Sequence, residues 1–276
     1  MKLSFHNRQL ETFPSFPSGI KELSVFKNLI IEIPNHLWEE TGIEILNVSM
    51  NKIEELSPEI DKLKNLKMLD AGHNKIKKIP NEIGNLISLD SFLYLHNNQI
   101  ENVPEEIGNL SELRYLNLSM NCINILPNSI GNLKHLVELK LEKNKIKMLP
   151  ESISKLINLH ELHLQGNQLK FLPREIDKLN RLRFLNLDDN QIQEFPFLSS
   201  NITELKLRNN KIEVIPNGIS KLKKLRRLDL RGNLIKELPK EILELKSLER
   251  LDLRWNENIA KPNWLDELNP EILIYF

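Results

Sequence analysis

The apolar residues of this chain recur in one phrase, Leu-x-x-Leu-x-Leu-x-x-Asn-x-Ile, repeated along its length. A clear copy contains Leu136, Leu139, Leu141, Asn144 and Ile146. Successive phrases place their asparagines 23 residues apart, with one spacing of 24 and one of 20, at Asn28, Asn51, Asn74, Asn98, Asn121, Asn144, Asn167, Asn190, Asn210, Asn233 and Asn256. Self-similarity at a fixed period of about 20–29 residues predicts a solenoid, in which each repeat packs on its neighbours.

The alternation within each phrase predicts one short strand per repeat. Leu139 and Leu141 face one side of this strand, and the residues between and beside them face the other. Parallel strands of successive repeats stack about 4.8 Å apart, so each position of the phrase forms a row along the sheet. The second half of the repeat, Leu-Pro-x-x-Ile-x-x-Leu at 149–156, predicts a short helix or 3-10 turn with proline in its first turn.

The repeated asparagine predicts a ladder of buried side-chain amides. Where a strand ends, backbone groups turn inward and lose their sheet partners. An amide has two donors and an acceptor, enough to satisfy the turn and a neighbouring repeat together. We assign to this structural ladder Asn51, Asn74, Asn98, Asn121, Asn144, Asn167, Asn190, Asn210 and Asn233.

Composition narrows the classes of function. The 38 basic and 38 acidic residues balance, so no overall field favours nucleic acid or an anionic membrane. The single cysteine, Cys122, excludes an internal disulfide. The chain has no apolar run long enough to span a membrane, and its start lacks an apolar core of secretory-signal length. We therefore expect a cytoplasmic protein, or one secreted by a route or signal that the chain does not show.

These phrases resemble the leucine-rich repeat family, and the match covers essentially the whole chain. The Leu-Pro-x-x-Ile-x-x-Leu half is similar to the 23-residue subclass of bacterial and intracellular proteins. The resemblance implies an α/β fold: a horseshoe-shaped solenoid with a concave parallel β-sheet and short helices or 3-10 turns on the convex side. It also implies a role in binding proteins.

Two departures from the period carry structural information. The units containing Phe13–Ile20 and Phe195–Ile202 are three residues short and resemble a type whose convex side is more extended. The repeat of Asn98 has one extra residue, which predicts a bulge or loop adjustment before the strand of Tyr94. The assignment of Phe92 to the first strand row depends on where that extra residue is accommodated.

We predict a single leucine-rich repeat domain over residues 1–276, because no linker interrupts the repeats. It consists of a partial unit at 1–19, with Arg8 in place of asparagine, then eleven repeats over 20–256, then a capping segment at 257–276. The register predicts a last strand at Ile272–Phe276, after an irregular segment that contains Trp264 and Leu268.

The rows on the concave face define two candidate surfaces, of which we name the first the aromatic patch. It collects aromatic residues and methionines from adjacent repeats, the residue types that protein-binding surfaces use. The alternative is that some of these side chains fold inward around the extra residue, or that they only cover the sheet. The aromatic patch consists of Ile45, Met50, Met68, Phe92, Tyr94, His96, Tyr115 and Met120.

The second surface, the arginine patch, carries the pattern Arg-x-Asp-x-Arg on two successive strands. One interpretation is a lattice of surface ion pairs that stabilises little. The other is a site for an acidic protein surface or a phosphate, since surplus guanidinium donors remain. The arginine patch consists of Arg208, Arg227, Arg231, Arg250, Arg254 and Trp255.

Motifs for catalysis or metal binding are weak. His160-Glu-Leu-His163 is one residue short of the metalloprotease motif and lies on a predicted strand rather than a helix. His73, His96 and Asp70 are able to approach one another on adjacent repeats, although two solvated histidines are the simpler interpretation. The chain has no phosphate-loop, dinucleotide or nucleophile-elbow motif. We expect no catalytic residue, no metal and no cofactor.

The main functional hypothesis is a non-enzymatic module that binds a protein partner on its concave face. A first alternative is a bacterial virulence-type effector or secreted factor that engages host proteins, suggested by the two short units. A second is a scaffold that self-associates into homo-oligomers through open sheet edges at Leu3–Phe5 and Leu273–Phe276. Neither nucleic acid nor a membrane is an expected partner.

Overall fold

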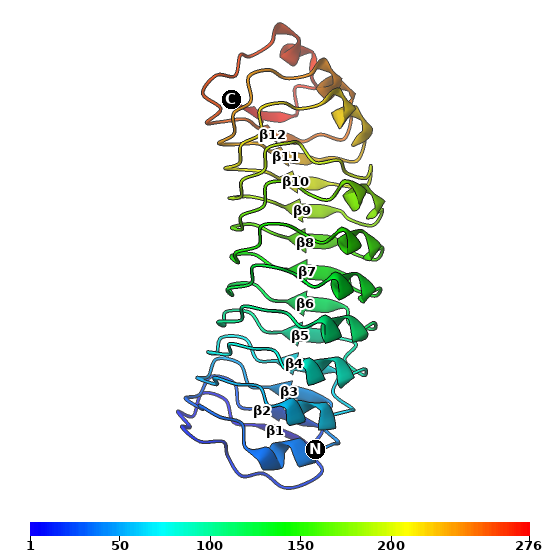
Figure 1. The fold of residues 1–276 in the computed structure, drawn as a ribbon. Coiled ribbons are helices and arrows are strands. Elements are labelled where there is room, and N and C mark those ends of the chain that lie inside the picture. Colours follow the sequence, from blue (N-terminus) through cyan, green and yellow to red (C-terminus); the bar gives the residue numbers. More distant parts are fainter. The chain divides into compact units, whose positions relative to one another are not determined.

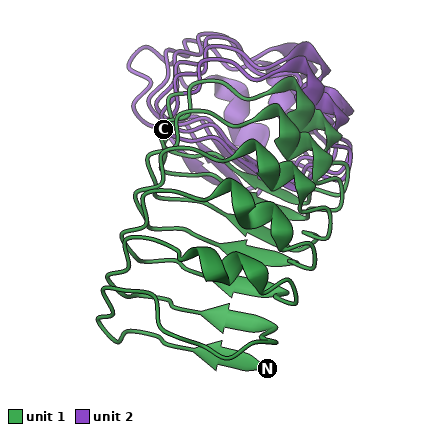
Figure 2. Ribbon diagram, turned by 60° about the horizontal axis from the view of Figure 1, so that its bottom comes forward, with its two compact units in different colours: residues 1–145 green, residues 146–276 purple.

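The computed structural model describes residues 1–276, and these form two compact units, unit 1 at 1–145 and unit 2 at 146–276 (Figure 2). The organisation as one domain stays a prediction. No helix in either unit has the length and apolar character needed to cross a membrane.

Each unit contains a parallel sheet whose strands follow the chain order (Figure 1). Every strand has three residues, fewer than the phrase predicts, and neighbouring strands pair in the predicted register, for example Leu46 with Leu69 and Leu69 with Leu93. The strands of unit 1 are β1 Lys2–Ser4, β2 Glu22–Ser24, β3 Ile45–Asn47, β4 Met68–Asp70, β5 Phe92–Tyr94, β6 Tyr115–Asn117 and β7 Glu138–Lys140. Those of unit 2 are β8 Glu161–His163, β9 Phe184–Asn186, β10 Glu204–Lys206, β11 Arg227–Asp229, β12 Arg250–Asp252 and β13 Leu273–Tyr275.

Short 3-10 helices form the second layer of each unit, and the predicted helical half of the repeat is therefore confirmed. Neighbouring helices lie side by side within a unit, as Figure 2 shows for unit 1. Unit 1 contains η1 Asn35–Glu39, η2 Pro58–Lys62, η3 Asn81–Asn85, η4 Glu105–Asn109 and η5 Asn128–Asn132. Unit 2 contains η6 Glu151–Lys155, η7 Arg174–Lys178, η8 Asn217–Lys221, η9 Lys240–Glu244 and η10 Asn263–Glu267.

Relative to these helices, proline lies one residue earlier than the first-turn position that the sequence predicts. Except before η2, it is the N-cap and has extended dihedrals, such as φ −67° and ψ 147° at Pro80. Its carbonyl accepts the first helical hydrogen bond, from the N–H of Ile83 at 3.1 Å. A residue without an N–H loses nothing there, because the N-cap needs only its carbonyl. In η2, Pro58 occupies the first turn and the hydroxyl of Ser57 caps the N–H of Glu59 at 3.2 Å.

The irregular repeats behave as their lengths predict. The two short units, around Phe13–Ile20 and Phe195–Ile202, contain no 3-10 helix. The extra residue of the Asn98 repeat is accommodated at a bend at Ser91, directly before β5. The ladder is not interrupted, because Phe92 pairs with both Met68 and Tyr115. At the other end of the chain, β13 pairs with β12 as the predicted last strand, and η10 forms within the segment predicted to be irregular.

The core of each unit lies between its sheet and its helices. It consists of the leucines and isoleucines of the repeated phrase, of which Leu139, Leu141 and Ile153 are fully buried. The 3-10 helices of unit 1 approach most closely at two glycines. A Cβ on Gly84 would lie 2.4 Å from the carbonyl oxygen of Glu106, and one on Gly108 would lie 2.5 Å from that of Ser129. Glycine is required here because the neighbouring backbone occupies the space of a side chain.

The asparagines form a hydrogen-bonded ladder along the end of the strands. Asn121 is typical: its Nδ2 donates to the carbonyls of Leu118 and Ser119 in its own repeat and of Leu95 in the preceding one, at 3.0–3.1 Å. Its Oδ1 accepts the N–H of Ile100 at 3.0 Å. The ladder begins at Asn28, whose Oδ1 accepts the N–H of Arg8. It thus satisfies backbone groups that no strand or helix satisfies.

Candidate functional site

The aromatic patch lies on the outer face of the unit 1 sheet, the side of β3 to β6 that points away from the core. In each of these strands the central leucine is buried and the two flanking residues are half-buried, because successive side chains alternate between the two sides of a strand. Met68, Phe92 and Tyr115 therefore form one row, and Tyr94 lies in the next. No residue of the patch has folded into the core.

The rings of the patch contact one another. Phe92 stacks on Tyr115 with centroids 4.8 Å apart and planes at 23°, and Tyr94 meets Phe92 edge-on at 5.2 Å. His96 continues the cluster, 6.1 Å from Tyr94 and 4.7 Å from His73. Such pairs contribute about 0.5–1.5 kcal/mol beyond the area they bury. The rings therefore hold one another in place, so the apolar surface is preorganised.

The position of His96 depends on Gly72, a residue that the sequence did not link to it. Any Cβ on Gly72, one repeat earlier, would lie 2.3 Å from the His96 ring, so only glycine leaves room for the imidazole. Burial, and then the neighbouring His73, lower the pKa of His96, which is therefore neutral at pH 7. Its Nδ1 is buried and has no hydrogen-bond partner within the protein. Burial likewise raises the pKa of Tyr94, whose phenol stays protonated.

Polar side chains next to the patch are already satisfied. Asn117 accepts hydrogen bonds from the hydroxyl and the N–H of Ser119, and Asn47 does the same for Ser49. At one end of the row Glu22 pairs with Lys2, 2.7 Å away. The surface between these hydrogen-bonded and ion-paired side chains is apolar and aromatic.

The arginine patch lies on the outer face of unit 2, and each of its arginines is paired with a carboxylate. Arg254 binds Asp252 through two bonds of 2.9 and 2.7 Å, and Arg250 reaches the same carboxylate at 3.1 Å. The remaining pairs are Arg231 with Asp229, Arg227 with Glu204, and Arg208 with Asp189. The lattice that the sequence left open as one interpretation is thus present. Whether the patch also binds a partner does not follow from the lattice.

Aromatic rings flank this lattice. Arg231 and Arg254 each lie 5.7 Å from the ring of Trp255, and Arg250 and Arg254 lie 5.0 and 4.9 Å from that of Tyr275. These are cation–π distances. Sequence reasoning missed Tyr275, although the register would have found it, because Tyr275 pairs with Asp252 across β12 and β13.

Asp188, which follows β9, is a buried acid whose pKa is raised to about 6, mainly by burial; the N–H of Arg208 opposes this shift. The folded pKa lies above the unfolded value near 3.8. Protonation therefore stabilises the fold at low pH, and this contribution is lost as the pH rises from about 4 to about 6. We expect Asp188→Asn to raise the free energy of unfolding by about 2 kcal/mol at pH 8 and to change it little near pH 4.

Urea unfolding of the wild type and Asp188→Asn at both pH values measures this difference. The asparagine keeps an oxygen that can accept the Arg208 N–H. The matched control is Asp189→Asn, which neutralises an exposed neighbour and is expected to change stability little at either pH. If the variant is no more stable than the wild type at pH 8, burial of the ionised Asp188 carboxylate does not destabilise the fold.

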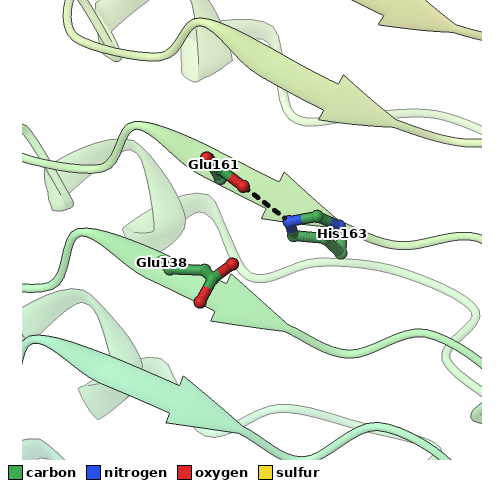
Figure 3. Close-up of side chains that lie close together, drawn as sticks. All are labelled: Glu138, Glu161 and His163. Atoms are coloured by element: carbon green, nitrogen blue, oxygen red, sulfur yellow. Dashed lines mark hydrogen bonds and ion pairs between the residues drawn. The ribbon is translucent and has the colours of Figure 1, made fainter.

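The remaining histidines do not form a catalytic arrangement. Figure 3 shows His163 bound to Glu161 of the same strand, and the distance between Nε2 of the histidine and Oε2 of the glutamate is 3.1 Å. His160 contacts the carbonyl of Asn158 through its Nδ1 at 2.8 Å instead. His73 and His96 do meet, as described above, but Asp70 accepts the N–H of Gly72 at 3.0 Å. Cys122 is a half-buried free thiol.

Comparison with known proteins identifies the repeats. Family models match at three places: a leucine-rich repeat region over residues 93–191, a leucine-rich repeat over 200–257 and another over 65–86. Together the matches cover more than half of the chain. The chain is a leucine-rich repeat protein. The predicted family and solenoid fold are thereby confirmed, and the repeats of this family are generally non-catalytic. A search of curated protein sequences finds no significant match.

Solved leucine-rich repeat structures resemble it along most of its length. A leucine-rich repeat protein of Leptospira interrogans is 28% identical, with a TM-score of 0.62, over 93% of this chain and 84% of that one. The plant peptide hormone receptor RGFR1, in complex with RGF2, is 25% identical with a TM-score of 0.69, and 86% of this chain covers 44% of it. The functional domain of InlJ from Listeria monocytogenes, 21% identical with a TM-score of 0.73, shares the fold over 94% of this chain and 58% of its own.

Proposed function

We propose that this leucine-rich repeat chain is a non-enzymatic interaction module that binds a protein partner on its aromatic patch. One observation carries the proposal: Phe92, Tyr94 and Tyr115 are mutually packed but only half-buried on the outer face of unit 1. Aromatic side chains in such clusters dominate binding energy at protein interfaces, because they bury much area and lose little entropy. Met50 and Met120 at the margin are exposed and adapt their shape to a partner.

The relatives agree with a role in binding. RGFR1 is described as a plant peptide hormone receptor in complex with RGF2. We also infer that the chain belongs to the 23-residue subclass, on the spacing of its asparagines and its 3-10 helices.

The test is affinity capture with quantitative mass spectrometry, from the source organism and from any host. The variant Phe92→Ala/Tyr94→Ala/Tyr115→Ala removes the ring cluster. We expect it to recover the wild-type partner at least about tenfold less, since each buried aromatic contributes 2 kcal/mol or more at an interface. Capture from a host alone would favour the effector alternative.

A matched control removes exposed apolar side chains elsewhere on unit 1. Ile31→Ala/Ile87→Ala/Ile125→Ala changes three exposed isoleucines of unit 1 outside its strands, and should recover the partner as the wild type does. Equal recovery by the aromatic variant, or loss with the isoleucine control alone, would contradict the proposal.

Self-association is a second candidate, favoured by two unpaired strand edges. β1 and β13 each pair on one side only, and Leu273 and Phe276 beside the latter are exposed. Sedimentation velocity across a dilution series separates the candidates. A chain that stays monomeric at every concentration excludes this one.

A further inference from the structure

We propose that the arginine patch of unit 2 is a docking surface for an acidic peptide segment of a protein partner. The proposal does not rest on the aromatic patch. It follows from how charge, ring contacts, backbone strain and shape combine on one outer face.

The first observation is a layering of charge. The carboxylate of Asp252 is completely buried and that of Asp229 is 18% exposed, whereas the Arg227 side chain is 60% and that of Arg250 43% exposed. Burial alone raises the pKa of Asp252, but hydrogen bonds from Arg254 and Arg250 offset this and hold the pKa below its usual value. The Asp252 carboxylate therefore stays ionised beneath the guanidinium groups. In the ion pairs Arg227–Glu204, Arg231–Asp229 and Arg250–Asp252 the arginine side chain is the more exposed partner, so these pairs present positive charge to solvent.

The second observation is that the guanidinium groups are held in place. Asp252 fixes Arg254 through two bonds of 2.9 and 2.7 Å, while the rings of Trp255 and Tyr275 flank it at 5.7 and 4.9 Å. A free arginine loses about 2 kcal/mol of rotamer freedom when it binds. Here much of that freedom is already lost in the free protein, so a partner carboxylate gains more from each contact.

The third observation is Trp255 itself. It has φ +64° and is 64% exposed. The corresponding positions of the other repeats in unit 2 also have positive φ, and they hold glycine, aspartate or asparagine, the residues that tolerate this conformation best: Gly166, Asp189, Asn209 and Gly232. A bulky residue in this conformation costs on the order of 1 kcal/mol. A strained, exposed tryptophan beside paired arginines suits an interface, where tryptophan and arginine are among the residues that contribute most to binding.

The shape limits the occupant. A hollow of about 430 Å³ is lined by Arg227, Arg231, Arg250 and Lys206, together with Glu204, Asp229, Glu249 and three leucines. This volume admits a few side chains rather than a folded domain. The acidic residues interrupt the positive surface, which disfavours a polyanion with evenly spaced phosphates. Separate carboxylates on a flexible peptide can instead pair with the guanidinium groups and avoid the acidic residues.

Fluorescence anisotropy with a defined probe tests the proposal. The probe is a short fluorescein-labelled peptide in which glutamate alternates with alanine, and its neutral counterpart has glutamine instead. We expect the glutamate peptide to bind in a salt-dependent manner and the glutamine peptide not to bind. Arg227→Gln/Arg250→Gln should weaken binding at least about tenfold, because it removes the most exposed donors.

Controls separate binding from folding and charge. Arg174→Gln/Arg181→Gln removes the same charge from exposed positions outside the patch and should bind like the wild type. Arg227→Gln alone leaves the contacts of buried Asp252 intact, so it should weaken binding without loss of thermal stability. Trp255→Gly should weaken binding although it relieves backbone strain. The aromatic-patch variant should bind the peptide normally.

Three of the results that would overturn the proposal concern the arginine patch itself. The first is that Arg227→Gln/Arg250→Gln and the wild type bind the glutamate peptide with equal affinity. The second is that the glutamine peptide binds as well as the glutamate peptide. The third is that inorganic phosphate or an oligothymidylate competes more strongly than unlabelled glutamate peptide. Retained peptide binding by the aromatic-patch variant supports two separate surfaces. Loss of the peptide with that variant alone would assign the acidic segment to unit 1 and overturn the proposal as well.

Discussion

Asn121→Ala is expected to lower the free energy of unfolding by about 3 kcal/mol, although it removes a polar amide and not an apolar side chain of the core. The substitution leaves the N–H of Ile100 without its acceptor and the carbonyls of Leu95, Leu118 and Ser119 without this donor. All four groups lie where water does not readily replace the amide, since Asn121 is buried. Urea unfolding followed by circular dichroism measures the loss.

Asn121→Asp makes the same argument sharper. It keeps the shape but points a carboxylate oxygen at carbonyls 3.0–3.1 Å away. At neutral pH the loss should exceed that of alanine, and part of it should be recovered on acidification as the carboxyl takes up a proton. Asn132→Ala, on the exposed side of η5, is the control and should cost within about 0.5 kcal/mol. An Asn121→Ala protein as stable as this control would contradict the role of the ladder.

Gly108→Ala is expected to destabilise the protein by about 2 kcal/mol, against the usual preference of helices for alanine. The added Cβ would lie 2.5 Å from the carbonyl oxygen of Ser129 and 2.6 Å from its Cβ. Because the obstacle is backbone of the next helix, η4 and η5 have to separate. Urea unfolding at neutral pH reports the change.

Gly218→Ala provides the matched comparison within the chain. Gly218 lies in η8, has no positive φ, and a Cβ there would meet no atom within 4 Å. This substitution should stabilise by about 0.4–1 kcal/mol, because alanine has less freedom to lose on folding. Equal responses of Gly108 and Gly218 would show that the close approach of η4 and η5 does not limit the repeat spacing.

The strand register was predictable because its signal is repeated. The pair of apolar strand residues and the asparagine mark the same positions eleven times, so a single ambiguous repeat is corrected by its neighbours. Phe92 illustrates this: one extra residue left its row open, and the pairing with Met68 and Tyr115 confirms the assignment. The members of both patches follow from this register, whereas their function as binding sites stays a prediction.

Features that depend on the distance between repeats could not be predicted. The contact of Gly72 with His96 and that of Gly108 with Ser129 arise from how closely adjacent turns approach, which no repeat specifies alone. Which carboxylate each arginine pairs with could not be predicted either, because several carboxylates lie within reach of each flexible side chain. The raised pKa of Asp188 comes from its burial by neighbouring repeats rather than from its position in the phrase.

The direction of the ladder has a consequence for synthesis on the ribosome. The N–H of Ile100 is satisfied by Asn121, 21 residues later, and that of Ile212 by Asn233, also 21 residues later. The N–H two residues after each of these asparagines is therefore satisfied only by the asparagine of the following repeat. Because translation proceeds from the N-terminus, every newly emerged repeat waits for its successor before its backbone is fully bonded. Folding of each unit should advance along the nascent chain with a lag of about one repeat.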